Sequence, residues 1–225
     1  MHTDVKGVIL TLLEARGYLF SVIHTLLGAE PTKEMLSAAS SEESLAALFV
    51  LEDGEHEALG RLADVLKGLR EADCEALSGE YTRLMLGPEE LPAPPWESVY
   101  RDKNRALFQA STLAVHGWYE QFGFVPAGYP HYPDDHISLM MHFMALTCER
   151  AAAALREGRL DAYRNLLAGQ LLFEQNHLLS WLGPWAKDME KSKTQLFYPQ
   201  FAQAVSDVIL YDHDLLLDIM GSEQA

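Results

Sequence analysis

The chain of 225 residues can bury roughly 70% of the surface that its unfolded form would expose, so one sizeable domain with a hydrophobic core is expected. Its 48% hydrophobic and 22% charged content is ordinary for a globular protein and argues against long disorder. The net charge of −16 would repel a phosphate backbone, and no basic stripe reverses that field locally, so nucleic acid is excluded as a partner. The same charge favours encounter with a cationic partner.

The amino terminus lacks the basic region and apolar run of a secretory signal, and no stretch approaches the roughly 20 apolar residues of a membrane span. Cys74 and Cys148 are the two cysteines, far apart and without a CxxC pair, which fits a reducing compartment. We therefore expect a cytoplasmic protein without stable membrane insertion.

Apolar residues recur at helical spacing almost throughout the first half of the chain, and no segment alternates as a strand would. Thr32 is predicted to cap one short helix, and Ser40 with Glu43 has the capping-box spacing before another. The longer helices predicted here span residues 4–28, residues 54–70 and a run that begins after Asp73 and ends at Gly87-Pro88.

Two stretches rich in proline and glycine interrupt the helical pattern, because proline lacks the backbone donor and crowds the preceding turn. Residues 87–100 are predicted to form a long irregular loop, and residues 123–133 divide the chain into two helical halves. The helices predicted beyond these loops span residues 102–122, 134–157, 160–182 and a last segment within 194–219, where Pro199 marks a first turn or a kink. The whole pattern predicts an all-α bundle.

Three motifs follow one another in a specific order. They are Tyr81-x-x-Leu84-Met85-x-Gly87-Pro88 with Pro94-Pro95-Trp96-Glu97-Ser98-Val99-Tyr100, then Tyr132-Pro133-Asp134-Asp135-His136-Ile137-Ser138, then Phe173-x-x-x-His177-Leu178-Leu179-x-Trp181-Leu182 with Phe197-Tyr198. This set, covering residues 81–201, resembles the TorD/DmsD family of twin-arginine (Tat) redox-enzyme maturation chaperones. Met85 stands where the family more often has Phe, a swap of similar volume.

The resemblance implies a single all-helical domain over residues 1–225, with a hinge loop at 123–133 that would permit either a monomer or a domain-swapped homodimer. It also implies a cytoplasmic chaperone, not an enzyme, with no cofactor of its own. Such a chaperone binds the twin-arginine leader or the apo catalytic subunit of a molybdenum oxidoreductase, and assists cofactor loading and proofreading before Tat export. Guanine nucleotide is a further partner linked to the family.

A leader with paired arginines and an apolar stretch needs carboxylates and aromatic rings beside a hydrophobic groove. The segment from Pro88 to Asp102 is acidic, and Asp134-Asp135 precedes a helix that one of the two carboxylates is expected to cap, with His136 in its first turn. Methionines 140, 141 and 144 are interpreted as core residues rather than an adaptable wall of the site. The residues predicted to bind the leader are Trp96, Glu97, Ser98, Tyr100, Asp134, Asp135, His136 and His177.

Two alternatives from other classes remain open. A metal-dependent hydrolase would use Asp134, Asp135, His136 and His142, but the two histidines are six residues apart and face different sides of a helix. His213 and Asp214 supply only an isolated His-Asp pair. A nucleotide-binding module would lack both a P-loop and a GxGxxG motif.

Overall fold

The computed structural model describes residues 3–52, 57–102, 105–126, 132–194 and 196–222. Every regular element in these ranges is helical, and their β contact is an isolated antiparallel bridge between Trp96 and His136. The prediction of an all-α fold is confirmed.

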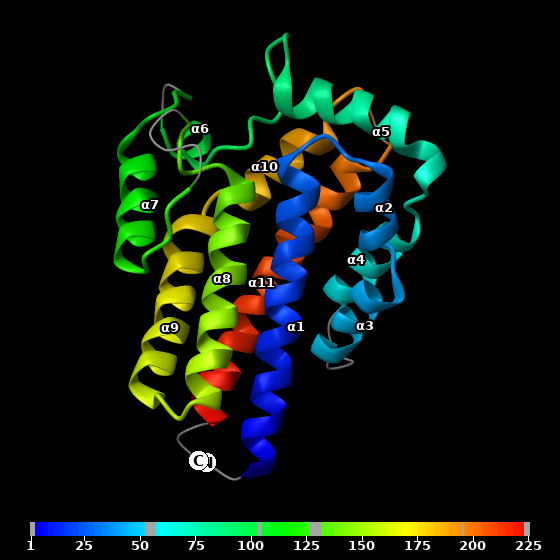
Figure 1. The fold of residues 1–225 in the computed structure, drawn as a ribbon. Helices are drawn as coiled ribbons and strands as arrows, with labels where there is room; N and C mark the ends of the chain where they lie inside the picture. Colours follow the sequence, from blue (N-terminus) through cyan, green and yellow to red (C-terminus); the bar gives the residue numbers. More distant parts are fainter. Residues whose placement is uncertain (1–2, 53–56, 103–104, 127–131, 195, 223–225) are drawn as a thin grey trace.

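The helices form a bundle whose long members run side by side (Figure 1). In the first half they are α1 (Thr3–Gly28), α2 (Lys33–Ala39), α3 (Glu42–Leu51), α4 (Glu57–Lys67), the short turn η1 (Glu71–Asp73), α5 (Cys74–Tyr81) and the π-helical turn η2 (Thr82–Leu86). In the second half they are α6 (Glu97–Arg101), α7 (Ala110–Gln121), α8 (Ile137–Arg156), α9 (Leu160–Phe173), the π-helical turn η3 (Glu174–Leu178), α10 (Leu182–Glu190) and α11 (Tyr198–Ser222).

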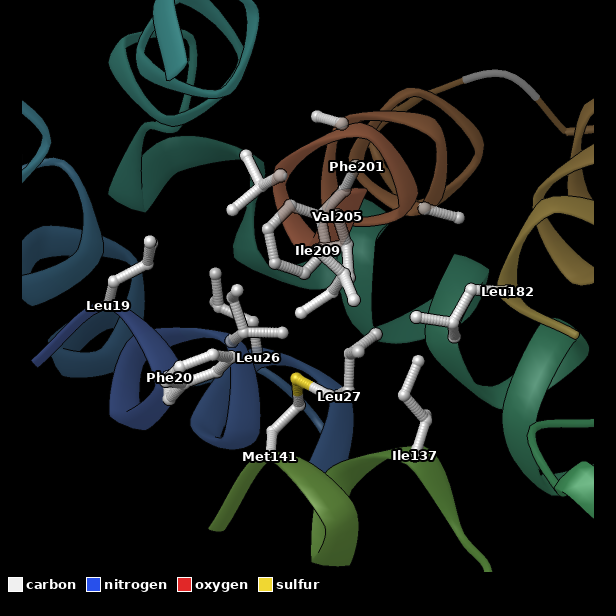
Figure 2. Close-up of a cluster of buried hydrophobic side chains, with 14 of the residues drawn as sticks. Leu19, Phe20, Leu26, Leu27, Ile137, Met141, Leu182, Phe201, Val205 and Ile209 are labelled. Atoms are coloured by element: carbon white, nitrogen blue, oxygen red, sulfur yellow. The ribbon is translucent and has the colours of Figure 1, made fainter. Parts of the chain in front are cut away.

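The hydrophobic core is shared by the two halves. Phe20 and Leu27 of α1 and Met141 of α8 are completely buried, and Figure 2 shows them directed into the same cluster as Phe201 and other side chains of α11. Methionines 140, 141 and 144 are all completely buried, which confirms their interpretation as core residues. Because α1 packs along α8, neither half encloses this core alone.

Helix α1 corrects the sequence prediction about membrane spans. Its segment Val5–Gly28 reaches a mean hydropathy of 1.2 over 18 residues and is long and apolar enough to cross a membrane. In the fold this helix packs between α8 and α3 (Figure 1), and 44% of that apolar window is buried. The apolar character of α1 therefore partly reflects its place in the core, and part of its apolar surface stays uncovered.

The first helix caps agree only in part with the sequence prediction. The Thr32 side chain accepts a hydrogen bond from the Met35 N–H at 3.2 Å, so the predicted cap of α2 is confirmed. The prediction of a capping box at Ser40 was wrong, because α3 is capped by Ser41, which accepts from the Ser44 N–H at 3.2 Å. Two adjacent serines make the choice ambiguous from sequence, and tertiary packing selects one.

The region between residues 87 and 109 departs most from the predicted helices. The predicted loop at 87–100 contains the short helix α6, and the predicted helix at 102–122 begins only at Ala110 as α7. Arg105 and Phe108 have positive φ angles of 50° and 58°, which a right-handed α-helix cannot accommodate. Helical spacing of apolar residues is therefore misleading in this stretch.

The carboxyl-terminal helices also differ from the prediction. The predicted helix at 160–182 ends as α-helix at Phe173 and continues as the π-helical turn η3, after which α10 forms a helix that was not predicted. The last helix, α11, places Pro199 in its first turn, where its missing N–H has no intrahelical acceptor. Part of the predicted hinge at 123–133 falls on residues 127–131, outside the described residues, so domain exchange stays a prediction.

A buried ion pair joins α1 to α11. The Arg16 guanidinium donates to both carboxylate oxygens of Asp212, at 2.6 and 2.8 Å. Burial, and after it the neighbouring Asp212, raises the pKa of the Glu174 carboxyl well above its usual range. This shift favours the protonated, neutral form of Glu174 beside the Arg16–Asp212 ion pair.

Candidate functional site

The first and second sequence motifs meet at the start of α8. Trp96 and His136 form an antiparallel bridge, and their rings lie edge to face with centroids 5.2 Å apart. The flanking backbone hydrogen bonds run from Glu97 N–H to Asp135 O, at 3.1 Å, and from Ile137 N–H to Pro95 O, at 2.9 Å. The 87–100 segment thus lies against the start of α8, as expected if the leader-binding residues predicted in the first two motifs share one site.

The carboxylate of Asp135 caps a neighbouring helix rather than its own. Its Oδ2 accepts from the Ser98 N–H in the first turn of α6 at 2.7 Å, and the side chain is completely buried. The cap of α8 is instead His136, whose Nδ1 accepts from the Ser138 N–H at 3.1 Å. The predictions that an aspartate caps α8 and that His136 lies inside its first turn were therefore wrong.

Glu97 links α6 to the third motif. Its completely buried carboxylate accepts from the Nδ1 of His177 on η3 at 3.0 Å and from Arg101 Nη1 at 2.6 Å. Arg101 Nη1 also donates to the backbone oxygen of Asn176 at 2.7 Å. All three motifs are thus joined by one polar network.

Asp134 fastens the second motif to α7. Its Oδ2 accepts from His116 Nδ1 at 2.7 Å, and its backbone oxygen accepts from the Tyr119 hydroxyl at 3.0 Å. Burial, and after it Asp134, raises the pKa of the Tyr119 hydroxyl well above its ordinary value, so this phenol stays a proton donor. Asp134 is itself 3% exposed and has a structural role in this conformation.

A second set of contacts holds the start of α8 against the end of α1. His24 Nδ1 donates to Ser138 at 2.9 Å for the backbone oxygen and 2.8 Å for Oγ, and the Ser138 hydroxyl donates to the His24 backbone oxygen at 3.1 Å. His24 also stacks on His142 with centroids 4.5 Å apart. Gly28 is required beside Ser138, because a Cβ there would lie 2.5 Å from the Ser138 hydroxyl.

His136 is held as a neutral ring. Burial, together with the nearby His24, lowers the pKa of His136 from 6.5 to about 4. The neutral state fits its cap geometry, because Nδ1 must carry a lone pair to accept from the Ser138 N–H.

The structure brings together seven of the eight residues predicted to bind the leader. Glu97, Ser98, Asp134, Asp135 and His177 are buried within the network described above, whereas Trp96 and His136 remain partly exposed beside each other. Tyr100 lies apart, stacked on Trp181 with centroids 5.6 Å apart, in a hollow of about 380 Å³ between α6 and α10. The buried carboxylates therefore position this region, and its accessible surface is formed by Trp96 and His136.

A groove of about 870 Å³ begins on the same chain segment that leads to Trp96. It lies between residues 83–92 on one side and residues 191–194 with Leu196 on the other, and its apolar lining includes Leu84 and Pro92. Glu89 and Glu90 line it together with three basic side chains, which are Arg83, Lys191 and Lys193. Trp185 fastens the segment from inside by donating Nε1–H to the Ala93 oxygen at 3.3 Å.

The proposed hydrolase residues each have another partner. Asp134 and Asp135 bind His116 and the Ser98 N–H, His136 caps α8, and His142 stacks on His24. His213 contacts Glu174 at 3.2 Å on a different face. Within the described residues, no three His, Cys, Asp or Glu side chains are arranged to hold a metal ion.

Sequence reasoning missed several residues that support the site. His116, His24 and Tyr119 bind motif residues but lie outside the motifs, so no local signal marked them. Glu80, one residue before the first motif, is completely buried and accepts from three successive backbone N–H groups at the start of α11. Its acceptor distances are 2.9 Å to Leu196, 2.8 Å to Phe197 and 3.0 Å to Tyr198.

Comparison with known proteins identifies chaperones with similar sequences. The chain is 36% identical over 115 residues to the Tat proofreading chaperone DmsD of Salmonella typhi, covering 51% of this chain and 52% of that protein. It is 26% identical over 174 residues to the chaperone protein TorD of Aliivibrio fischeri, covering 75% and 79%. The alignments span little more than half the length of the DmsD relatives.

The fold has a counterpart among solved structures. A crystal structure described as a redox enzyme maturation protein from Archaeoglobus fulgidus matches with a TM-score of 0.50 and 23% identity, covering 88% of this chain and 93% of that one. The family model described as nitrate reductase delta subunit matches residues 50–187, which include the first two motifs and most of the third. The chain therefore belongs to the nitrate reductase delta subunit family, and its relatives include the TorD and DmsD chaperones that the motifs indicate.

Proposed function

We propose that this protein is a cytoplasmic, system-specific chaperone that binds the twin-arginine leader or the apo catalytic subunit of a molybdenum redox enzyme before Tat export. The observation that carries the proposal is the pairing of Trp96 with His136, which brings two motifs from distant parts of the chain into one surface. The buried contact between Glu97 and His177 attaches the third motif behind it. The names of the DmsD and TorD relatives support the same function. In this role the protein assists maturation by binding and catalyses no reaction.

The geometry supports a division of labour within the site. Glu97 and Asp135 are completely buried and already hydrogen-bonded, so their role is to hold α6 against α8 and η3. The partly exposed rings of Trp96 and His136 are left to contact the leader. An arginine guanidinium stacks favourably on such an indole face.

The adjoining groove of about 870 Å³ suits the apolar stretch of the leader. Pro92 and Leu196 provide exposed apolar surface, and the exposed carboxylates of Glu89 and Glu90 lie at its side for the paired arginines. Each exposed carboxylate contributes only about 0.2–1 kcal/mol to such a pair, so neither is decisive alone. Lys191 and Lys193 oppose cationic ligands on the other side and therefore favour one orientation of the leader.

Titration calorimetry with synthetic leader peptides from neighbouring reductase genes tests the proposal. Trp96→Ala should weaken leader binding by roughly 1–3 kcal/mol, because an aromatic anchor is lost. Leu113→Ala is the matched control, since Leu113 is an exposed apolar residue of α7 outside the site. A leader whose two arginines are replaced by lysines should bind more weakly, because lysine cannot form the planar bidentate contact.

Charge is tested separately from the apolar contacts. The double substitution Glu89→Gln with Glu90→Gln should weaken leader binding more at low salt than at high salt. The double substitution Glu71→Gln with Glu75→Gln changes the net charge equally at exposed positions outside the groove and should leave affinity nearly unchanged. Equal affinity in wild type, Trp96→Ala and the groove variant would contradict the proposed site, and no binding of any leader peptide would contradict the function.

A further inference from the structure

A second apolar groove is lined by the first half of α1 and the last half of α11, which Figure 1 places toward the end of the bundle opposite α6 and α10. It consists of two hollows of about 310 and 230 Å³ between α1 and α11, the second of which extends to the end of α3. Both hollows are lined by Leu12, Leu215 and Asp218, so they form one continuous trough. We call this trough the α1–α11 groove.

The floor and walls of the α1–α11 groove are apolar and uncovered. Val8 is 56% exposed, Val50 is 42% exposed and Val5 is 37% exposed, and all three line the groove. Val5 and Val8 belong to the apolar surface of α1 that remains exposed after the helix packs in the core, and Val50 extends this surface onto α3. A contiguous apolar surface framed by polar groups is typical of an interaction site.

The charged residues that line the groove are all acidic: Glu52, Asp214 and Asp218. Asp214 and Asp218 are exposed and have no basic side chain within ion-pair distance in the described part of the chain.

The basic side chains near the groove are engaged elsewhere. Lys6 points away from the groove toward α8, where its Nζ donates to the Arg156 oxygen at 3.4 Å. Arg61 on α4 is paired with Glu57 and Asp207.

The length of the groove fits a short helix. From Val5 to Leu12 the α1 wall extends about 10 Å, and from Tyr211 to Ser222 the α11 wall extends about 16 Å, at the ordinary helical rise. A helix of roughly three turns would lie along it with one apolar stripe buried, which is a common mode of peptide recognition.

We propose that the α1–α11 groove docks a cationic amphipathic helix of a partner polypeptide. The apolar stripe of that helix lies against Val8, Leu12 and Leu215, and its lysines or arginines face Asp214, Asp218 and Glu52. A second copy of this chain is disfavoured, because two acidic rims would face each other. An anionic membrane surface is disfavoured for the same reason. The groove is separate from the Trp96–His136 surface and does not depend on the proposed leader binding.

The test measures binding of a labelled synthetic peptide of about 14 leucine and lysine residues, spaced to form one apolar face, by fluorescence anisotropy. Asp214→Asn with Asp218→Asn should weaken binding roughly fivefold at low salt, while the control Glu71→Gln with Glu75→Gln, which has the same net charge, should stay near wild type. Val8→Ser should weaken binding roughly fivefold, and the control Val125→Ser, at another exposed valine, should not.

Three results would overturn the proposal. The first is equal weakening by groove and control variants, which would show nonspecific attraction to an acidic protein. The second is concentration-dependent dimerisation of the wild type that Val8→Ser abolishes, which would make the groove an interface between copies. The third is binding to phosphatidylglycerol vesicles that Val8→Ser abolishes. Leader affinity should be the same in wild type and in the groove variants. If no variant and no wild-type protein bound a leader peptide, the proposed function would fail, but the peptide-binding result at the α1–α11 groove would still stand.

Discussion

The carboxylate of Asp135 accepts a hydrogen bond from the Ser98 N–H at 2.7 Å and so fastens the first turn of α6 to the residue before the α8 cap. This single contact connects two motifs that are 37 residues apart in the chain. It also removes Asp135 from the accessible surface, where a leader-binding carboxylate was expected. Asp135 therefore shapes the site by holding α6, and we propose that it does not contact the leader directly.

Asp135→Ala should lower the free energy of unfolding by roughly 1–3 kcal/mol, because the Ser98 N–H is left without its buried acceptor. Asp135→Asn should cost less, since an amide oxygen can still accept that hydrogen bond. Urea unfolding followed by circular dichroism measures both. Leader affinity should fall in the alanine variant and largely return in the asparagine variant; a fall of equal size in both would indicate a direct contact with the negative charge.

Protonation of His136 should destabilise the fold. Its pKa falls from 6.5 to about 4 on folding, so between these pH values the unfolded chain binds more protons than the folded one. The stability that this group contributes is present above about pH 6.5 and is lost as the pH falls toward 4.

Wild type should lose roughly 2 kcal/mol from this source between about pH 7 and pH 5. His136→Asn keeps a side-chain acceptor at the α8 cap but does not titrate, so its unfolding free energy should depend less on pH. Denaturant unfolding at the two pH values gives the comparison. Identical pH dependence of the two proteins would show that His136 is not held neutral.

Asp212 and Glu174 should respond very differently to loss of charge. Asp212→Asn removes the anion that pairs with the buried Arg16 and should cost roughly 3 kcal/mol of unfolding free energy. Glu174→Gln should cost less than about 1 kcal/mol, because the raised pKa of Glu174 already favours the neutral form of that carboxyl.

The double variant of these two residues should be less stable than the sum of the single changes predicts. When Asp212 is neutral, Glu174 can ionise and partly replace it as the partner of Arg16, and the second substitution prevents this. A double-mutant cycle from chemical denaturation measures the coupling. Strict additivity would mean that Glu174 does not substitute for Asp212.

Glu80→Ala should lower the unfolding free energy by roughly 2–4 kcal/mol, because it leaves three backbone donors at the start of α11, two of them buried, without their acceptor. Glu75→Ala on the same helix is the control, since Glu75 is exposed. Thermal unfolding monitored by circular dichroism distinguishes them. Similar midpoints for the two variants would show that water replaces the Glu80 carboxylate at little cost.

The amino-acid sequence by itself determined the helical class, the family and the neighbourhood of the site. Apolar spacing along α1 and α8 follows the helical period because those faces are buried in the core, and local chemistry is sufficient to cap α2 at Thr32. The motifs around Trp96 and His136 were expected to meet, and they do so through a backbone bridge.

Tertiary structure alone decided which polar groups are accessible and which helix each of them serves. Asp135 caps α6 instead of α8 because the folded chain brings the Ser98 N–H to it, a contact that no spacing along the sequence specifies. Likewise Glu97 is buried because His177 arrives from η3 to bind its carboxylate, next to Arg101 of the same helix. Burying a carboxylate is tolerated only where such partners gather, and their gathering is a property of the whole fold.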